Sequence, residues 1–209
     1  MKRRFLFSLR VFQILLIWTT LASAQGLGVR FGLNYSSAST EPELPLRSWT
    51  GAMVGGTGEV KLDQYFFLLG GVIYAEKGAK ITLADSVLGN FETIAKFNYL
   101  EFPIALKAKL GTASLKPYLF AGPNYGINLS AENRNYFNDG SVIIEDIKGE
   151  TRKIYFNLDF GCGVEYAVVP NLSFLFDTRY SLGLSNMIIS NENSWKSHSL
   201  QLIGGVLLK

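Results

Sequence analysis

The chain of 209 residues contains little cysteine, proline and charge, and these shortages exclude several classes of protein. A single cysteine, Cys162, excludes an intramolecular disulfide framework. Charged residues make up 18% of the chain and hydrophobic residues 48%, with only 6 prolines beside 21 glycines. Disordered chains combine low hydrophobicity with high charge, so this composition excludes them and indicates a folded domain.

The small positive net charge of +3 arises at the start of the chain. The first 24 residues contain four basic and no acidic side chains, which leaves 16 basic against 17 acidic residues in 25–209. A nucleic-acid-binding domain would carry a basic patch within its folded part. The charge balance therefore gives no indication of a nucleic-acid partner.

The first 24 residues have the pattern of a secretory signal peptide. Basic residues at 2–4 precede an apolar run at 11–21, and small residues end the segment at Ala24. A membrane-spanning helix is the alternative, but the run is well short of the ~20 apolar residues that a span needs. The sequence predicts a signal peptide over 1–24, cleavage after Ala24, and one exported domain over 25–209.

The exported part has a hydrophobic period of two, which is typical of β-strands with one apolar face. In 153–166, for example, Ile154 and Leu158 share the apolar face, whereas Asn157 and Asp159 share the polar face. Eight such segments are predicted as strands: 26–35, 51–62, 65–78, 99–110, 118–130, 153–166, 171–184 and 198–208. Segment 65–78 is apolar almost throughout, so the pattern does not decide which of its faces points inward.

Strand length and connection length both favour a membrane barrel. Most predicted strands have about 10–14 residues, whereas strands of soluble proteins usually have ~5–6 and membrane-crossing strands ~9–11. Long connections (36–50, 79–94, 131–152, 185–197) alternate with short ones (63–64, 111–114, 167–170). The prediction is an all-β, eight-stranded antiparallel up-and-down transmembrane β-barrel with short periplasmic turns and long extracellular loops.

The charged residues of the strands indicate which face is inside. On the lipid face, Arg or Lys near the bilayer midplane would cost ~2–4 kcal/mol each, so we expect the charged face to line the lumen. An eight-stranded barrel is just wide enough for its own side chains, which predicts a plugged lumen. The predicted structural charge network of the lumen is Arg30, Glu59, Lys61, Glu101, Lys107, Lys109, Asp159, Glu165, Asp177 and Arg179.

Two prolines, Pro103 and Pro123, conflict with this arrangement because both lie inside predicted strands. A closed barrel has no edge strand on which a proline is easily tolerated. Either they lie at bulges near a rim, or the strand limits differ from those predicted.

Five short motifs resemble the PorT-like family of outer-membrane β-barrel proteins of Gram-negative bacteria. They are GVRFGLNYS at 28–36, IYAEKGAK at 73–80, YLEFPIALK at 99–107, YLFAGPNYG at 118–126 and TRYSLGLSN at 178–186. The resemblance covers nearly all of 25–209 and implies the barrel fold. It also implies a place in the envelope, since the name-giving member belongs to a secretion and gliding apparatus. No catalytic residue carries over.

The sequence offers few candidates for catalysis or metal binding. His198 lies among serines, including Ser197 and Ser199, but no G-x-S-x-G motif is present, so a histidine at the barrel rim is favoured over a hydrolase site. One histidine, one cysteine and no acidic cluster with ligand spacing predict no metal site and no cofactor.

Aromatic residues near the predicted strand ends are expected to form girdles at the membrane interfaces. Those assigned to interfacial positions are Tyr35, Trp49, Tyr136 and Trp195. Trp49 and Trp195 border extracellular loops and are expected in the outer girdle.

These features predict a non-enzymatic integral protein of the bacterial outer membrane. Its expected partners are membrane lipid, the outer-membrane assembly machinery, and an envelope or extracellular protein that contacts loop 131–152. Two alternatives remain open. One is an outer-membrane lipid-modifying enzyme, which would need His198 within about 3 Å of a loop serine. The other is a secreted soluble lipocalin-like barrel, which would have an apolar interior.

Overall fold

The computed structural model describes residues 25–41, 43–85, 89–111, 114–189 and 194–209. The predicted signal peptide, 1–24, lies outside the described residues. Eight long strands form the barrel: β1 (Gly26–Glu41), β2 (Arg47–Lys61), β3 (Phe66–Asp85), β4 (Gly89–Lys109), β5 (Leu115–Tyr136), β7 (Ile154–Val169), β8 (Leu172–Gly183) and β9 (Ser194–Leu208). A short strand, β6 (Val142–Asp146), and a 3₁₀ turn, η1 (Lys148–Glu150), lie between β5 and β7. Within the described residues, no helix is long and apolar enough to span a membrane.

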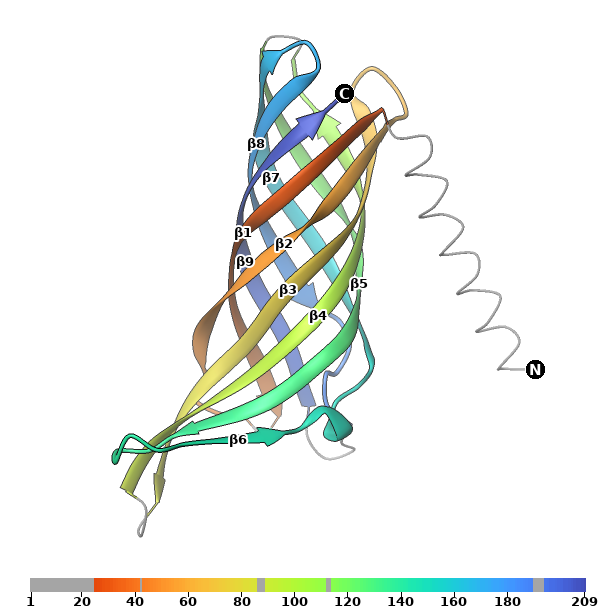
Figure 1. Ribbon diagram of the computed structural model, residues 1–209. Helices are drawn as coiled ribbons and strands as arrows, with labels where there is room; N and C mark the ends of the chain where they lie inside the picture. Colours follow the sequence, from red (N-terminus) through yellow and green to blue (C-terminus); the bar gives the residue numbers. More distant parts are fainter. Residues whose placement is uncertain (1–24, 42, 86–88, 112–113, 190–193) are drawn as a thin grey trace, which may run out of the picture.

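The barrel closes through antiparallel pairing of its first and last strands. β1 pairs with β9 from Leu27–Leu208 to Glu41–Ser194, and every other barrel strand pairs with its neighbours along the chain. β6 stays outside the wall and pairs with the far end of β5 (Figure 1). The predicted eight-stranded antiparallel up-and-down barrel is confirmed.

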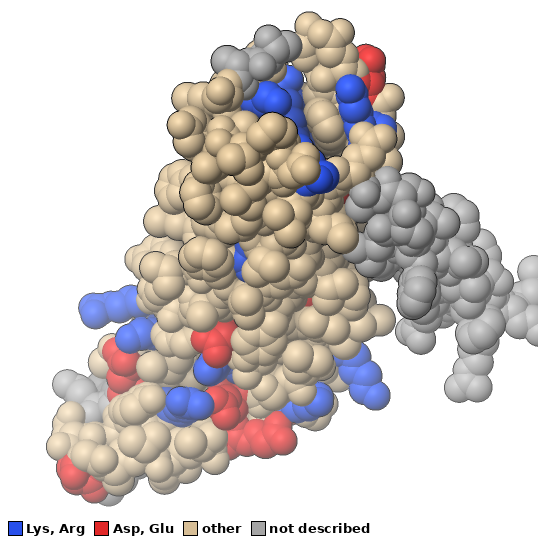
Figure 2. All heavy atoms as spheres, turned by 45° about the horizontal axis from the view of Figure 1, so that its top comes forward, with Lys and Arg blue, Asp and Glu red and all other residues tan. Residues whose placement is uncertain are grey.

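The two faces of each strand have opposite polarity. In β7, Asn157 and Asp159 are buried inside the barrel, whereas Ile154 and Leu158 are exposed outside. The same alternation places Phe31 and Phe176 on the outer surface, each more than half exposed. Figure 2 shows a broad surface with few charged side chains between two more highly charged ends. An apolar outside around an interior that holds many charged side chains is the polarity of a membrane barrel, and it differs from the lipocalin-like alternative even though apolar clusters share that interior.

Several strands are much longer than the sequence pattern predicted. β3, β4 and β5 contain 20, 21 and 22 residues, so most of the predicted connection 79–94 is strand. At ~3.3 Å per residue, a 22-residue strand reaches about 70 Å, while ~9–11 tilted residues already cross a bilayer. These strands therefore project beyond the barrel wall at the end opposite the short β2–β3, β4–β5 and β7–β8 connections (Figure 1).

We call the two ends of the barrel the short-turn end and the long-loop end. The short-turn end contains the connections β2–β3, β4–β5 and β7–β8, together with the start of β1 and Lys209. The long-loop end contains the β3–β4 hairpin, β6 and the β8–β9 connection.

Both prolines lie within strands, at interruptions in the pairing around β4. The β3–β4 ladder skips the pairs around Pro103, which would face Gly71. The β4–β5 ladder skips Pro123, which would face Ile104. Because proline has no N–H to donate, each interruption falls where a ladder bond would be missing. Of the two alternatives, bulges near a rim are not found, since both positions have regular pairs on either side; the strand limits do differ from those predicted, but both prolines stay inside the longer strands.

Candidate functional site in the charged lumen

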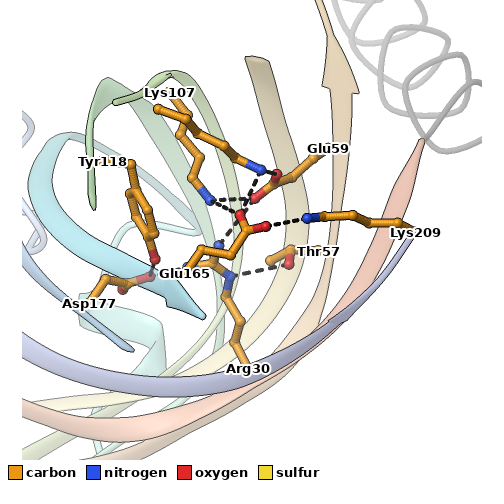
Figure 3. A network of polar contacts seen from close by, with 9 residues as sticks. Arg30, Thr57, Glu59, Lys107, Tyr118, Glu165, Asp177 and Lys209 are labelled. Carbon is orange, nitrogen blue, oxygen red and sulfur yellow. Dashed lines mark hydrogen bonds and ion pairs between the residues drawn. The ribbon is translucent and has the colours of Figure 1, made fainter. Parts of the chain in front are cut away.

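The lumen near the short-turn end is crossed by a network of ion pairs, which we call the short-turn network. It consists of Arg30, Thr57, Glu59, Lys107, Lys109, Tyr118, Glu165, Asp177 and Lys209 (Figure 3). These residues come from β1, β2, β4, β5, β7 and β8 and from the position after β9. The period of two turns each side chain inward, and closure of the wall brings them within reach of one another.

Glu59 and Glu165 are the two most heavily paired acids of this network, with three basic partners each. Glu59 Oε1 accepts a hydrogen bond from Lys107 Nζ at 2.6 Å, and Glu59 Oε2 accepts one from Lys109 Nζ at 2.6 Å. Lys109 Nζ also lies 2.7 Å from Glu165 Oε2, and Lys209 pairs with the other oxygen of Glu165. Two carboxylates are thereby held by three lysines.

Asp177 connects Arg30 to the opposite side of the barrel. Arg30 Nη1 pairs with Asp177, and Arg30 Nε donates to Thr57 Oγ1 at 3.2 Å. The hydroxyl of Tyr118 donates to Asp177 Oδ2 at 2.7 Å. Arg30 and Asp177 are fully buried, and Asp177 on β8 thus links β1 to β5, which lies four strands away in the ring.

A second set of contacts, the central network, lies on the same inner face. It consists of Lys77, Glu101, Asn124, Tyr155, Asp159, Arg179 and Ser181. Lys77 Nζ is 2.8 Å from Glu101 Oε1, and Tyr155 donates to the same carboxylate. Asn124 Nδ2 lies 2.9 Å from both Glu101 and Asp159, so one amide group bridges the two acids. Two basic and two acidic side chains balance here.

The lumen toward the long-loop end is filled by an aromatic cluster. Its buried members are Ala95, Phe97, Tyr99, Ala131, Tyr155 and Met187, and Trp195 packs against them. The rings of Tyr99 and Tyr155 meet edge to face, with centroids 4.3 Å apart. Met187 belongs to the β8–β9 connection and is 2% exposed, so this connection folds back onto the cluster.

The structure places nine of the ten predicted lumen residues in the buried interior: Arg30, Glu59, Glu101, Lys107, Lys109, Asp159, Glu165, Asp177 and Arg179. Lys61 differs, because it is the last residue of β2 and its side chain is exposed at the mouth of the barrel.

One of the two tryptophans assigned to the outer girdle lies inside the barrel. Trp195 packs against the buried Phe97, so it lies on the inner face, whereas the Trp49 ring lies against Gly78 and the Lys96 ammonium, and its place in the girdle stays a prediction. β9 begins before the predicted limit, and the period of two then carries Trp195 inward. Tyr35 and Tyr136, the other residues assigned to interfacial positions, have exposed side chains.

Several residues of the lumen were missed by sequence reasoning. Lys77 lies in segment 65–78, whose inward face the sequence pattern left undecided. Its side chain is buried on the same inner face as the apolar Ile73 and Ala75. Tyr118 shares its face with Asn124, and this parity was the signal that could have placed its ring inside.

His198 and its neighbouring serines lie on opposite faces of β9. Ser197 and Ser199 are buried in the lumen, whereas the His198 side chain is half-buried on the other face. In the described part of the chain, no group of three or more His, Cys, Asp and Glu side chains is placed to hold a metal ion.

Comparison with known families decides the class of this barrel. The model described as "Outer membrane protein beta-barrel domain" matches residues 23–188. The chain belongs to this family. It is therefore an outer-membrane β-barrel protein, and its place is the bacterial outer membrane. The alternation of apolar outer and polar inner faces is the physical basis of that assignment.

Solved structures similar to this outer-membrane barrel share little sequence with it. Neisserial surface protein A is 20% identical, with 88% of this chain and 96% of that chain covered and a TM-score of 0.49. The attachment invasion locus protein Ail of Yersinia pestis is 14% identical, with coverages of 88% and 98% and a TM-score of 0.42. OprG of Pseudomonas aeruginosa is 11% identical, with coverages of 88% and 96% and a TM-score of 0.48. No curated protein sequence matches the chain significantly.

Proposed function

We propose that this protein is a non-enzymatic, non-conducting outer-membrane barrel that contacts a partner through its long-loop end. The observation that carries the proposal is the short-turn network, whose buried ion pairs join strands two places apart and together link six of the eight wall strands through the lumen. A barrel of eight strands has no spare width once such side chains meet across its axis.

Opening a channel would require these ion pairs to separate. Removing one partner of a buried pair leaves an uncompensated charge, at a cost of about 3–5 kcal/mol. The central network and the aromatic cluster add two further obstructions along the same axis. A continuous water path would need all three sets of contacts to rearrange.

The long-loop end provides the proposed contact surface. Every residue of β6 is exposed, and Val142, Ile143 and Ile144 are 46%, 50% and 58% exposed. β6 pairs with β5 on one side, and among the described residues no strand pairs with its other side. An exposed apolar edge of this kind can accept an extended segment of another chain.

The turn that presents β6 is held by its own side chains. Asp139 Oδ1 accepts hydrogen bonds from the backbone N–H of Ser141 at 2.8 Å and from its hydroxyl at 2.6 Å. These bonds lower the pKa of Asp139. Gly140 adopts a φ of 83°, which favours glycine at this position. The β5–β6 hairpin is thus a defined element suited to presenting an edge.

The resemblance to the PorT-like family supports a more specific role. In this proposal the protein is exported by its signal peptide, cleaved after Ala24, and inserted by the outer-membrane assembly machinery. The partner of segment 131–152 is then a component of an envelope or secretion apparatus.

Conductance in planar lipid bilayers tests the closed lumen. We expect no stepwise conductance from the purified barrel, and a stable open channel from the unaltered protein would contradict the proposal. A photo-crosslinker at Ile143 in living cells tests the contact surface. It should yield a discrete protein adduct, whereas the same crosslinker at the lipid-facing Phe31 should not. Equal adducts at both positions would count against a partner at β6.

A further inference from the structure

A cavity of about 470 Å³ opens at the short-turn end of the barrel, away from the proposed contact surface. Sites for small molecules commonly have about 300–1,000 Å³. The residues that carry charge in its lining are Glu59, Lys61, Lys109, Lys116 and Lys209. Figure 2, which turns this end toward the viewer, shows basic side chains gathered around it.

The two buried acids beneath the cavity, Glu59 and Glu165, are already paired with lysines of the short-turn network, and the exposed Asp63 of the β2–β3 turn lies outside the lining. Both oxygens of Glu59 accept hydrogen bonds, from Lys107 and Lys109, and both oxygens of Glu165 lie against lysines. The cavity lining contains four lysines and one glutamate, which gives its side chains a net charge of +3.

Two of these lysines take no part in the network. Lys61 is exposed at the end of β2, and Lys116 is half-buried at the start of β5. Neither forms an ion pair with an acidic side chain in the described ranges of the chain. They come from different strands and line the same cavity, so their charges add at its mouth.

The remaining lining strengthens this positive field. Phe67 and Leu207 provide apolar walls, and Gln64 provides a neutral amide donor at the β2–β3 turn. A cleft lined by charge of one sign with apolar walls focuses its field and concentrates counter-ions. Lysine acts as a point charge toward phosphate, without the planar fork by which arginine matches carboxylates.

We propose that this cavity is a binding site for a compact, multiply charged oxyanion of the phosphate type. Lys61 and Lys116 donate to the anion from the two sides of the mouth. Lys109, fixed by Glu59 and Glu165, contributes its charge from the floor. The source of the phosphate group is either a soluble phosphate compound or the headgroup of a phospholipid in the inner leaflet.

Calorimetric titration of the folded barrel in non-ionic detergent with inorganic pyrophosphate tests the site. We expect one anion per barrel and an affinity that falls as salt is added. Lys61→Gln and Lys116→Gln should each weaken binding about tenfold, the loss expected for one charge-assisted hydrogen bond. The matched control is Lys153→Gln, which removes an exposed lysine before β7, outside the cavity lining, and should leave the affinity unchanged.

Closed membrane barrels resist detergent, so an unheated sample should migrate differently from a boiled one on a denaturing gel. Since both lysines stand outside the ion-pair network, their variants should keep this difference. The proposal is overturned if the double variant binds pyrophosphate as tightly as the unaltered protein. It is equally overturned if Lys153→Gln weakens binding as much as the other two substitutions.

Titration with water-soluble dibutyryl phosphatidylglycerol separates the two sources of phosphate. Tighter binding of this diester than of pyrophosphate, sensitive to Lys61→Gln, identifies the lipid headgroup. Tighter binding of pyrophosphate identifies a soluble anion. Failure of both ligands to bind contradicts the site, and it leaves the conductance and crosslinking results unaffected.

Discussion

The two halves of the lumen are filled by different chemistry. Near the short-turn end, buried ion pairs such as Lys107–Glu59 and Arg30–Asp177 occupy the interior. Toward the long-loop end, the rings of Phe97, Tyr99 and Tyr155 pack together. A buried charged group is destabilising unless a group of opposite charge lies within hydrogen-bond distance. Aromatic rings fill space through their contact area and do not depend on one particular partner. The comparison indicates that sensitivity to loss of charge is concentrated in the short-turn half.

The largest effect is expected for Glu59→Gln, which removes the carboxylate shared by Lys107 and Lys109. The substitution preserves shape but leaves two buried ammonium groups with one acid fewer, at a cost of about 3–5 kcal/mol. Urea unfolding in detergent micelles, followed by gel migration, measures the loss. Glu92→Gln is the control, because its 3.5 Å pair with Lys80 is partly exposed and worth about 0–1 kcal/mol. Equal losses for both variants would remove the contrast between buried and exposed pairs.

Substitutions at two neighbouring residues of β4 test which face of the strand points to lipid and which to the lumen. Ile104 is half-exposed on the outside of β4, and Ala105 is 4% exposed on the inside. Ile104→Arg should cost about 2–4 kcal/mol if it lies near the bilayer midplane. Ala105→Arg should cost about 1–3 kcal/mol through crowding of the packed interior.

Because these two ranges overlap, fluorescence quenching decides the facing. Single cysteines at 104 and 105 in a Cys162→Ser background are labelled and exposed to a lipid-dissolved nitroxide. Quenching should be stronger at 104. Stronger quenching at 105 than at 104 would mean that Ala105 faces lipid and Ile104 the lumen, which contradicts the assigned facing.

A smaller difference in stability is expected between two tyrosines that lie where the two halves of the lumen meet. Tyr155 donates to Glu101, whereas the hydroxyl of Tyr99 is buried with no hydrogen-bond partner in the described part of the chain. Tyr155→Phe should therefore lose about 1.5–3 kcal/mol, the value of a hydrogen bond to a charged group. Tyr99→Phe removes an unpaired polar group and should be neutral or stabilising. If thermal unfolding shifts by the same amount in both variants, ring packing alone governs this region.

The smallest effect is expected at the β5–β6 turn, outside the lumen. The bonds from Ser141 lower the pKa of Asp139, which means that they favour its ionised carboxylate. The turn is therefore stabilised at pH values above the ordinary carboxyl pKa. The stabilisation should be lost as pH falls through the lowered pKa. The protection factor of the Ser141 amide, which is the intrinsic exchange rate at a given pH divided by the observed rate, should fall at acid pH, and Asp139→Ala should show the reduced protection already at neutral pH. A protection factor that does not change with pH in the unaltered protein would contradict this role.

The sequence by itself determined the fold class and the facing of most side chains. A period of two with long strands predicted the eight-stranded barrel, and parity alone assigned residues such as Glu59 and Asp177 to the lumen. This follows because strand geometry sends alternate side chains to opposite faces, whatever their neighbours are.

Only the tertiary structure decided where strands end and which lumen residues meet. β2 and β9 continue beyond the predicted limits, and β9 carries Trp195 to the inner face. Lys77 is a partner of Glu101 because the register of β3 against β4 brings the two side chains together. The cavity between Lys61 and Lys116 exists because closure brings the ends of β2 and β5 to one mouth. Period fixes the face of a side chain, but register and closure fix its distance to residues far away in the chain.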